Sequence, residues 1–170
     1  MRAVSRIDDL VEELGAACRA AGWKLATAES CTGGGVAEAI TRLPGSSAWF
    51  QGGVVAYADE VKVALLGVHP QTLSTHGAVS EAVATEMARG AANKARADLG
   101  VGVTGIAGPG GASPGKPVGT VWIGWSGPGG AIHTRLRRFE GDREAIRQQA
   151  VEAALEGLVC LARDKGIAPE

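Results

Sequence analysis

The stretch Leu25-Ala-Thr-Ala-Glu-Ser-Cys-Thr-Gly-Gly-Gly35 decides how this chain folds and where its chemistry lies. Its first residues predict a short buried strand, and its glycines predict a tight turn into a helix. Free backbone N–H groups and the positive end of the helix dipole collect at such a turn, where they stabilise a phosphate or a developing oxyanion. Ser30, Cys31 and Thr32 lie there. A hydroxyl at this position is either a helix cap or a nucleophile beside its own oxyanion hole.

Patterns typical of helices and of strands alternate along the rest of the chain. Ser5 is a candidate cap for the first helix, and Gly22 ends it. Asp59 is expected to cap a short helix that Gly67 closes, and Ser80 to cap a long one. The expected elements are helices over residues 7–18, 33–43, 59–67, 80–91 and 141–165 and strands over 23–28, 49–57, 99–104, 118–125 and 131–139. Their order predicts one α/β domain over residues 1–170, with a mixed sheet of about five strands covered by helices on both faces.

The composition narrows the class of protein. A chain of 170 residues is long enough for one domain with a real core, and a formal net charge of −1 gives no general attraction to nucleic acid. The cysteines Cys18, Cys31 and Cys160 are odd in number and far apart, so no disulfide framework is implied. Cys18 and Cys160 fall on apolar helix faces and are expected in the core. No apolar run approaches membrane-spanning length, so a cytoplasmic location is expected.

A serine nucleophile needs a base, and the histidines are poor candidates for it. The G-x-S-x-G pattern of serine hydrolases is absent around Ser30. His69 precedes a proline in a turn, His76 lies beside a glycine, and His133 falls on the expected hairpin. Each is therefore expected to be solvated or structural.

Lys62 is a better candidate for the base. It lies in the helix after the strand that Tyr57 closes, and a lysine becomes a general base when burial or neighbouring charge lowers its pKa toward neutrality. Two alternatives stay open. In the first, Lys62 is exposed and paired with Asp59 or Glu60. In the second, Tyr57, the only tyrosine of the chain, is a core ring with a satisfied hydroxyl rather than a proton relay.

A second strand end opens into glycines at Val103-Thr-Gly-Ile-Ala-Gly-Pro-Gly-Gly111. Two such strand ends on one sheet make a cleft where phosphate or amide groups meet backbone N–H donors. The segment from Gly105 to Gly119 has almost no side-chain bulk, and its length is unusual for a connector in a small domain. We therefore expect a binding loop.

Two arginines lie four residues apart at the start of the last expected helix. The helix dipole disfavours cations there, and a bound phosphate would hold Arg143 and Arg147 in place through bidentate contacts. The alternative is that neighbouring carboxylates, such as Asp142 and Glu144, neutralise them at the surface. No cluster of histidine, cysteine and acidic residues has the spacing of metal ligands, so no metal or cofactor is expected.

Five segments extend in order over nearly the whole chain and together form a specific pattern: Ala28-Glu-Ser-Cys-Thr-Gly-Gly34, Gly52-Gly-Val-Val-Ala-Tyr57 with Lys62, Gly77-Ala-Val-Ser80, Val103-Thr-Gly-Ile-Ala-Gly-Pro109 and Lys116-Pro-Val-Gly-Thr120. With them the chain resembles the C-terminal domain of the competence/damage-inducible CinA family. Stand-alone forms of that domain are nicotinamide-nucleotide amidohydrolases. The larger members carry an additional N-terminal domain that has no counterpart in this sequence.

The resemblance implies a three-layer α/β/α sandwich that hydrolyses nicotinamide mononucleotide to nicotinate mononucleotide and ammonia in pyridine nucleotide recycling. It implies a serine nucleophile with lysine and tyrosine assistance, which places these roles on Ser30, Lys62 and Tyr57. The substrate is then a small molecule, and neither nucleic acid nor membrane is an expected partner. Whether the chain forms a homo-oligomer stays open.

The remaining site residues are predicted from the two glycine-rich turns and the basic residues. Backbone groups of the first turn, and of the second, are expected to hold the oxyanion and the substrate: Cys31, Thr32, Gly33, Gly34, Thr104, Gly105, Ala107 and Gly108. The phosphate is expected among Lys116, Arg143 and Arg147. Two other classes of protein stay open. One is a non-catalytic nucleotide-binding module or an interaction module associated with competence or DNA damage. The other is an enzyme or redox sensor that depends on a Cys31 thiolate.

Overall fold

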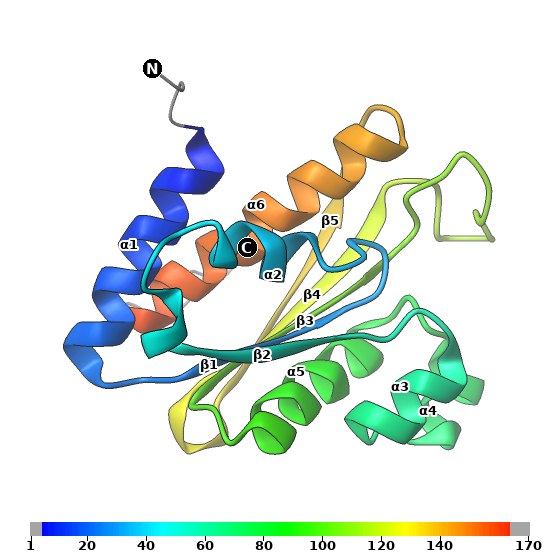
Figure 1. The fold of residues 1–170 in the computed structure, drawn as a ribbon. Helices are drawn as coiled ribbons and strands as arrows, with labels where there is room; N and C mark the ends of the chain where they lie inside the picture. The colour runs from blue at the N-terminus through cyan, green and yellow to red at the C-terminus, as the bar shows by residue number, and fades with distance from the viewer. Residues whose placement is uncertain (1–4, 164–170) are drawn as a thin grey trace.

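A five-stranded mixed sheet forms the middle of the molecule (Figure 1). The computed structural model describes residues 5–163. The strands follow the order β2-β1-β3-β4-β5, in which β1 pairs in parallel with β2 and β3, while β4 is antiparallel to β3 and β5. The predicted mixed sheet and its hairpin are therefore confirmed. The strands are β1 (Leu25–Glu29), β2 (Phe50–Val55), β3 (Leu99–Gly105), β4 (Thr120–Ser126) and β5 (Ile132–Arg138).

Helices cover both faces of the sheet and complete a three-layer α/β/α sandwich, as predicted (Figure 1). One face carries α1 (Arg6–Ala21), α2 (Gly35–Thr41) and α6 (Arg143–Ala162), which pack against one another. The other carries α5 (Glu81–Ala95), against which α3 (Asp59–Leu66) and α4 (Pro70–His76) pack. Two short 3₁₀ turns, η1 (Ser46–Ala48) and η2 (Pro128–Gly130), lie in the connections.

Glycines on the central strands let α5 approach the sheet closely. A Cβ atom at Gly102 of β3 would lie 2.5 Å from the carbonyl oxygen of Ala84, and one at Gly124 of β4 would lie 2.7 Å from the same atom. Both separations are shorter than packed side chains tolerate, so any larger residue would push the helix outward. This packing fixes the N-terminus of α5 near the ends of the strands.

Local capping residues set several helix ends as predicted. The Ser5 side chain accepts the N–H of Asp8 in a capping box, and Gly22 ends α1 with φ 71°. The Ser80 side chain accepts the N–H of Val83 at the start of α5. Gly67 ends α3, also in the left-handed conformation.

Three expectations about the helices are wrong. Ala58 is the N-cap of α3, so Asp59 is its first helical residue rather than its cap. The helix expected from residue 33 begins at Gly35, because Gly33 and Gly34 adopt positive φ angles of 60° and 99°. The segment expected as a turn after His69 forms α4, which has no buried residue and therefore no apolar periodicity to reveal it. The last helix is described as far as Ala162, and its expected end near residue 165 lies outside the described residues.

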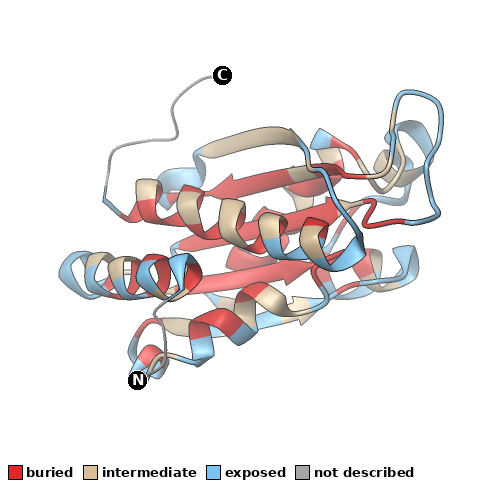
Figure 2. Ribbon diagram, turned by 90° about the horizontal axis from the view of Figure 1, so that it is seen from above, coloured by how far each residue is buried: buried red, intermediate tan, exposed pale blue. Residues whose placement is uncertain are grey.

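The buried residues gather on the central strands and on the helix faces that contact them (Figure 2). Cys18 and Cys31 belong to the core on the side of α1, α2 and α6, whereas Cys160 is only half-buried. None of the described helices is long and apolar enough to cross a membrane.

Candidate active site

The carboxyl ends of the three parallel strands meet at one edge of the sheet and bring the predicted segments together. Ser30 follows β1, Tyr57 comes two residues after β2, and Thr104 lies at the end of β3. The first residues of α6 reach the same edge, since Arg143 contacts Tyr57. Ligands of open α/β sheets bind at such an edge. The pattern of strand ends therefore predicted the location of the candidate site.

The turn after β1 holds Ser30 tightly by its backbone and leaves its hydroxyl without a partner. The Ser30 N–H donates to the carbonyl of Val103 on β3 at 2.9 Å, and the Ser30 carbonyl accepts the N–H of Gly33 at 3.0 Å. No atom within residues 5–163 forms a hydrogen bond with the Ser30 hydroxyl, and 9% of the residue is exposed. The hydroxyl is thus not a helix cap, and it is placed to act as a nucleophile.

Glu29 takes the capping role that the sequence left open for a hydroxyl. Its fully buried carboxylate accepts the hydroxyl of Thr32 at 2.7 Å and the N–H groups of Val36 at 2.8 Å and Ala37 at 3.1 Å. Sequence reasoning assigned no role to Glu29. The available signal was a single acidic residue that ends an apolar strand ahead of a helix with glycine at its N-cap, Gly34.

Arg147 contacts the same turn through backbone carbonyls. Its Nε donates to the carbonyl of Cys31 at 3.1 Å, and its Nη2 donates to the carbonyl of Thr32 at 3.2 Å. The guanidinium of Arg147, predicted to bind phosphate, therefore lies against the turn after β1.

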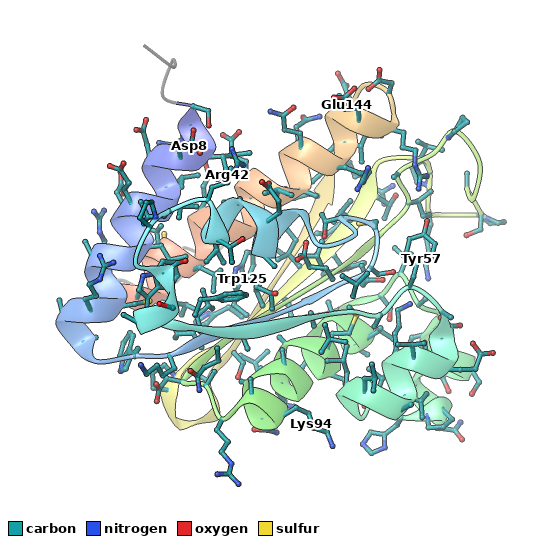
Figure 3. All side chains as sticks on the ribbon, in the orientation of Figure 1. Asp8, Arg42, Tyr57, Lys94, Trp125 and Glu144 are labelled. Carbon is teal, nitrogen blue, oxygen red and sulfur yellow. The ribbon has the colours of Figure 1, made fainter. Side chains whose placement is uncertain are left out.

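Arg143 bridges two other strand ends. Its Nη2 donates to the Tyr57 hydroxyl at 3.1 Å, and its Nη1 donates to the carbonyl of Gly108, beyond β3, at 2.8 Å. Tyr57 is 63% exposed and stands at the edge of the molecule above α3 (Figure 3). The alternative of a core tyrosine is therefore wrong.

Lys62 is buried, although it lies in the first turn of an outer helix. Only 1% of the residue is exposed. Its Nζ donates to the backbone carbonyl of Tyr57 at 3.0 Å and lies 3.5 Å from Oδ1 of Asp59. The alternative of a solvent-exposed lysine is thus wrong, although its pairing with Asp59 is present. The amine is held at the carboxyl end of β2 and shielded from solvent.

The second glycine-rich turn is built differently. The hydroxyl of Thr104 donates to the carbonyl of Ala78 at 2.8 Å and so ties β3 to the segment before α5. Beyond Gly108 the loop is exposed, and Lys116 donates to the carbonyl of His76 at 2.9 Å. Lys116 is therefore anchored to the end of α4, whereas Arg143 and Arg147 reach the edge where Ser30 lies.

The electrostatics of the first turn disfavour a cysteine nucleophile. Burial, with a smaller contribution from Glu29, raises the pKa of Cys31 to about 12 against the opposing influence of the residue's own backbone N–H, Arg147 and Arg143. The thiolate that the cysteine alternative requires is therefore scarce at neutral pH. In the part of the chain that the structure describes, no group of three or more histidine, cysteine or acidic residues is arranged to hold a metal ion.

Comparisons with known proteins agree with this architecture. Residues 7–161 match the model of the CinA C-terminal domain. The chain is 51% identical over 154 residues to the nicotinamide-nucleotide amidohydrolase PncC of Escherichia coli K12, which covers 91% of this chain and 93% of that protein. It is 52% identical over 151 residues to the PncC of Enterobacter agglomerans, covering 89% and 92%.

A solved structure shows the same fold. The competence/damage inducible protein CihA of Agrobacterium tumefaciens superposes with a TM-score of 0.90 at 42% identity, over 92% of this chain and 96% of that one. A CinA-like protein of Thermosynechococcus vestitus is 58% identical over 119 residues, which make up 29% of that protein.

Proposed function

Since this chain belongs to the CinA C-terminal domain family, we propose that it removes the amide nitrogen of nicotinamide mononucleotide by hydrolysis. It is an enzyme of the nicotinamide-nucleotide amidohydrolase class, in keeping with relatives of that name that it matches over about nine tenths of its length. The observation that carries the proposal is the unpaired Ser30 hydroxyl on a rigid turn, at the sheet edge that also holds Lys62 and Tyr57. The products are nicotinate mononucleotide and ammonia.

In the proposed reaction, Ser30 Oγ attacks the carboxamide carbon. Lys62 in its neutral form takes the hydroxyl proton, directly or through the Tyr57 hydroxyl, and the carbonyl electron pair moves onto oxygen. The C–N bond of the tetrahedral intermediate then breaks, and the departing nitrogen takes the proton from Lys62 and leaves as ammonia. Water, deprotonated by the same lysine, attacks the carbonyl carbon of the nicotinoyl ester on Ser30. The ester C–O bond then breaks, Ser30 Oγ takes the proton back from Lys62, and nicotinate mononucleotide leaves with its carboxyl proton lost to solvent.

The first turn offers backbone donors for the oxyanion. The N–H of Gly33 is taken by the Ser30 carbonyl, and those of Val36 and Ala37 are taken by Glu29. Among the described residues, nothing accepts the N–H of Thr32 or Gly34, and the N–H of Cys31 interacts only with its own thiol. These groups are the proposed oxyanion hole, with Ala107 and Gly108 across the edge as further donors to the substrate. Thr104 and Gly105, at the end of β3, are proposed to hold the backbone that carries Ala107 and Gly108 in place.

The phosphate of the nucleotide is proposed to bind Arg143. Its guanidinium lies between the ends of β2 and β3, where Tyr57 and Gly108 orient it. Lys116 and Arg147 were predicted beside it, but Lys116 is bonded to the end of α4, and both Arg147 contacts are to the turn after β1. Arg143 is therefore the residue whose removal tests the phosphate subsite most directly.

Ammonia release from nicotinamide mononucleotide tests the function. The unaltered protein is expected to be active, and Ser30→Ala to fall by at least about 10³-fold, since the residual rate rests on binding and the oxyanion hole alone. The matched control is Cys31→Ala, which is expected to keep most of the activity. An inactive Cys31→Ala with an active Ser30→Ala contradicts the assignment, and no ammonia from the unaltered protein favours a non-catalytic binding module.

A further inference from the structure

We propose that Glu29 and Arg147 are positioning residues, which together clamp the chain from residue 31 to residue 37 and so aim the Ser30 hydroxyl and the oxyanion donors. The inference rests on the proposed function, because it takes Ser30 as the nucleophile. Both side chains bind the chain that carries Ser30, so the proposal has them act through Ser30.

The Glu29 side of the clamp replaces a missing helix cap. Gly34, at the N-cap of α2, has no side chain to accept the N–H groups that follow it. These groups belong to Val36 and Ala37, and both donate to the Glu29 carboxylate. In most helices the side chain of the N-cap residue itself accepts the N–H of the second or third helical residue. Here the cap comes from the strand before the turn, so it ties the end of β1 to the start of α2 across the residues in between.

The charge of Glu29 matters as much as its reach. The carboxylate also accepts the Thr32 hydroxyl at 2.7 Å, so it receives three donors while fully buried. It lies at the positive end of the helix dipole, where a negative charge is stabilised. A glutamine of the same shape offers one acceptor oxygen, and its amide group would face an N–H donor. Glu29→Gln therefore loosens the turn with almost no change in volume.

The Arg147 side fixes the direction of peptide groups. Its guanidinium binds the carbonyls of Cys31 and Thr32, and each carbonyl shares a rigid plane with the next N–H. Holding the Cys31 carbonyl thus aims the N–H of Thr32, one of the proposed oxyanion donors. A Cβ atom at Gly33 would lie 3.1 Å from Nη2 of Arg147, so the guanidinium packs directly on the turn.

This role separates from phosphate binding by its kinetic signature. A residue that aims the nucleophile changes kcat, whereas a phosphate ligand changes KM for the mononucleotide. Displacements of about 1 Å cost on the order of 10²-fold in rate. We therefore expect Glu29→Gln and Arg147→Gln to lower kcat by about tenfold to a hundredfold and to leave KM within about twofold.

The experiment compares these variants with two matched controls. Glu38→Gln and Arg42→Gln make the same chemical changes in a surface pair, joined at 3.2 Å on α2 and its C-cap. Three quantities are measured for each protein: kcat and KM for nicotinamide mononucleotide, the melting temperature, and amide hydrogen exchange over residues 30–37. The clamp variants should exchange faster there than in the rest of the protein, beyond what any fall in melting temperature explains, and Arg147→Lys should recover part of kcat because one donor remains.

Each outcome decides the proposal. Lower kcat with faster exchange confined to the turn supports it. Unchanged kcat, unchanged exchange, or a raised KM alone overturns it, the last by returning Arg147 to the phosphate. If Glu29→Gln fails to fold, the two Arg147 variants decide by the same criteria. Activity retained by Ser30→Ala defeats the proposed function and the clamp together, whereas loss in Ser30→Ala with full activity in both clamp variants defeats the clamp alone.

Discussion

The turns after β1 and β3 begin alike in sequence and are built on different principles. Each starts with a hydroxyl residue at the end of a buried strand and continues into glycines. In the first, the Ser30 hydroxyl has no partner in residues 5–163, while Glu29 and Arg147 bind the surrounding backbone. In the second, the Thr104 hydroxyl itself is the tie, bonded to Ala78.

Under the proposed function, the contrast separates a reactive hydroxyl from a structural one. Other side chains bind the backbone of both turns, since Arg143 also binds the carbonyl of Gly108. What differs is the hydroxyl, which is left without a partner at Ser30 and is used for a tie at Thr104. Glycine-rich composition alone does not separate the two cases. Substitutions in and around each turn test this distinction through their effects on kcat, on KM and on the free energy of unfolding.

Apart from Ser30 itself, the largest loss of activity is expected at Lys62, the proposed base for Ser30. Lys62→Met keeps the buried stem and removes the amine, so kcat should fall by about 10²–10⁴-fold with little change in KM, as for loss of a general base. Steady-state kinetics with nicotinamide mononucleotide provide the measurement. Lys116→Met, on the loop of the second turn, is the matched control and should leave kcat nearly unchanged. Equal losses of kcat in the two variants would remove the contrast.

Arg143 joins the two regions, and its loss should affect binding more than chemistry. Losing a charge-assisted hydrogen bond costs about 1.5–3 kcal/mol, so Arg143→Ala should raise KM for the mononucleotide roughly tenfold to a hundredfold. Nicotinamide riboside, which has no phosphate, should be a poor substrate and indifferent to the change. Arg138→Ala, at an arginine bonded to the carbonyl of Gly115, is the control. Comparable turnover of riboside and mononucleotide by the unaltered protein would show that no phosphate subsite matters.

The two hydroxyls should differ in their effect on stability. Thr104→Val leaves the carbonyl of Ala78 without its partner and should lower the free energy of unfolding by about 1–3 kcal/mol. Ser30→Ala removes an unpaired hydroxyl and should change it by less than about 0.5 kcal/mol. Urea unfolding measures both, with Thr104→Ser as the variant that keeps the bond. A larger loss at Ser30 than at Thr104 would reverse the comparison.

The smallest effect is expected from thiol chemistry in the first turn. With its pKa raised to about 12 by burial, Cys31 is about one part in 10⁴ thiolate at pH 8. Iodoacetamide should therefore spare the activity and label the half-buried Cys160 first, as peptide mass spectrometry would show. The alkylation rate of Cys31 should rise about tenfold per pH unit as the solution is made more alkaline, as long as the fold persists. Rapid inactivation at pH 7 would instead restore the cysteine alternative.

Local signals in the sequence predicted the sheet and most helix ends because the residues that set them are neighbours. Ser5, Ser80 and Gly22 act within one turn of their own helices. The strand ends predicted where Ser30 and Thr104 would meet, since parallel strands end at one edge.

The rest depends on contacts that no local pattern encodes. Arg147 meets the carbonyls of Cys31 and Thr32 across 116 and 115 positions of the chain. Spacing within its own helix therefore suggested only a phosphate or neighbouring carboxylates as its partners. Likewise, the segment around Lys62 could not show whether tertiary packing would bury its amine. The missing helix α4 has no buried face, and hydrophobic periodicity cannot reveal such a helix.

The long reach of Arg147 also sets an order in time. During synthesis the turn that carries Ser30 leaves the ribosome about 115 residues ahead of the arginine that binds it, an interval of roughly 6–23 s at 5–20 residues per second. All five strands precede α6 in the chain. In a nascent protein that lacks α6, the proposed clamp therefore consists of Glu29 without Arg147. Under the proposed function, full activity is therefore expected only after α6, the last described helix, has docked. The rate of translation then sets the earliest time at which the complete site can form.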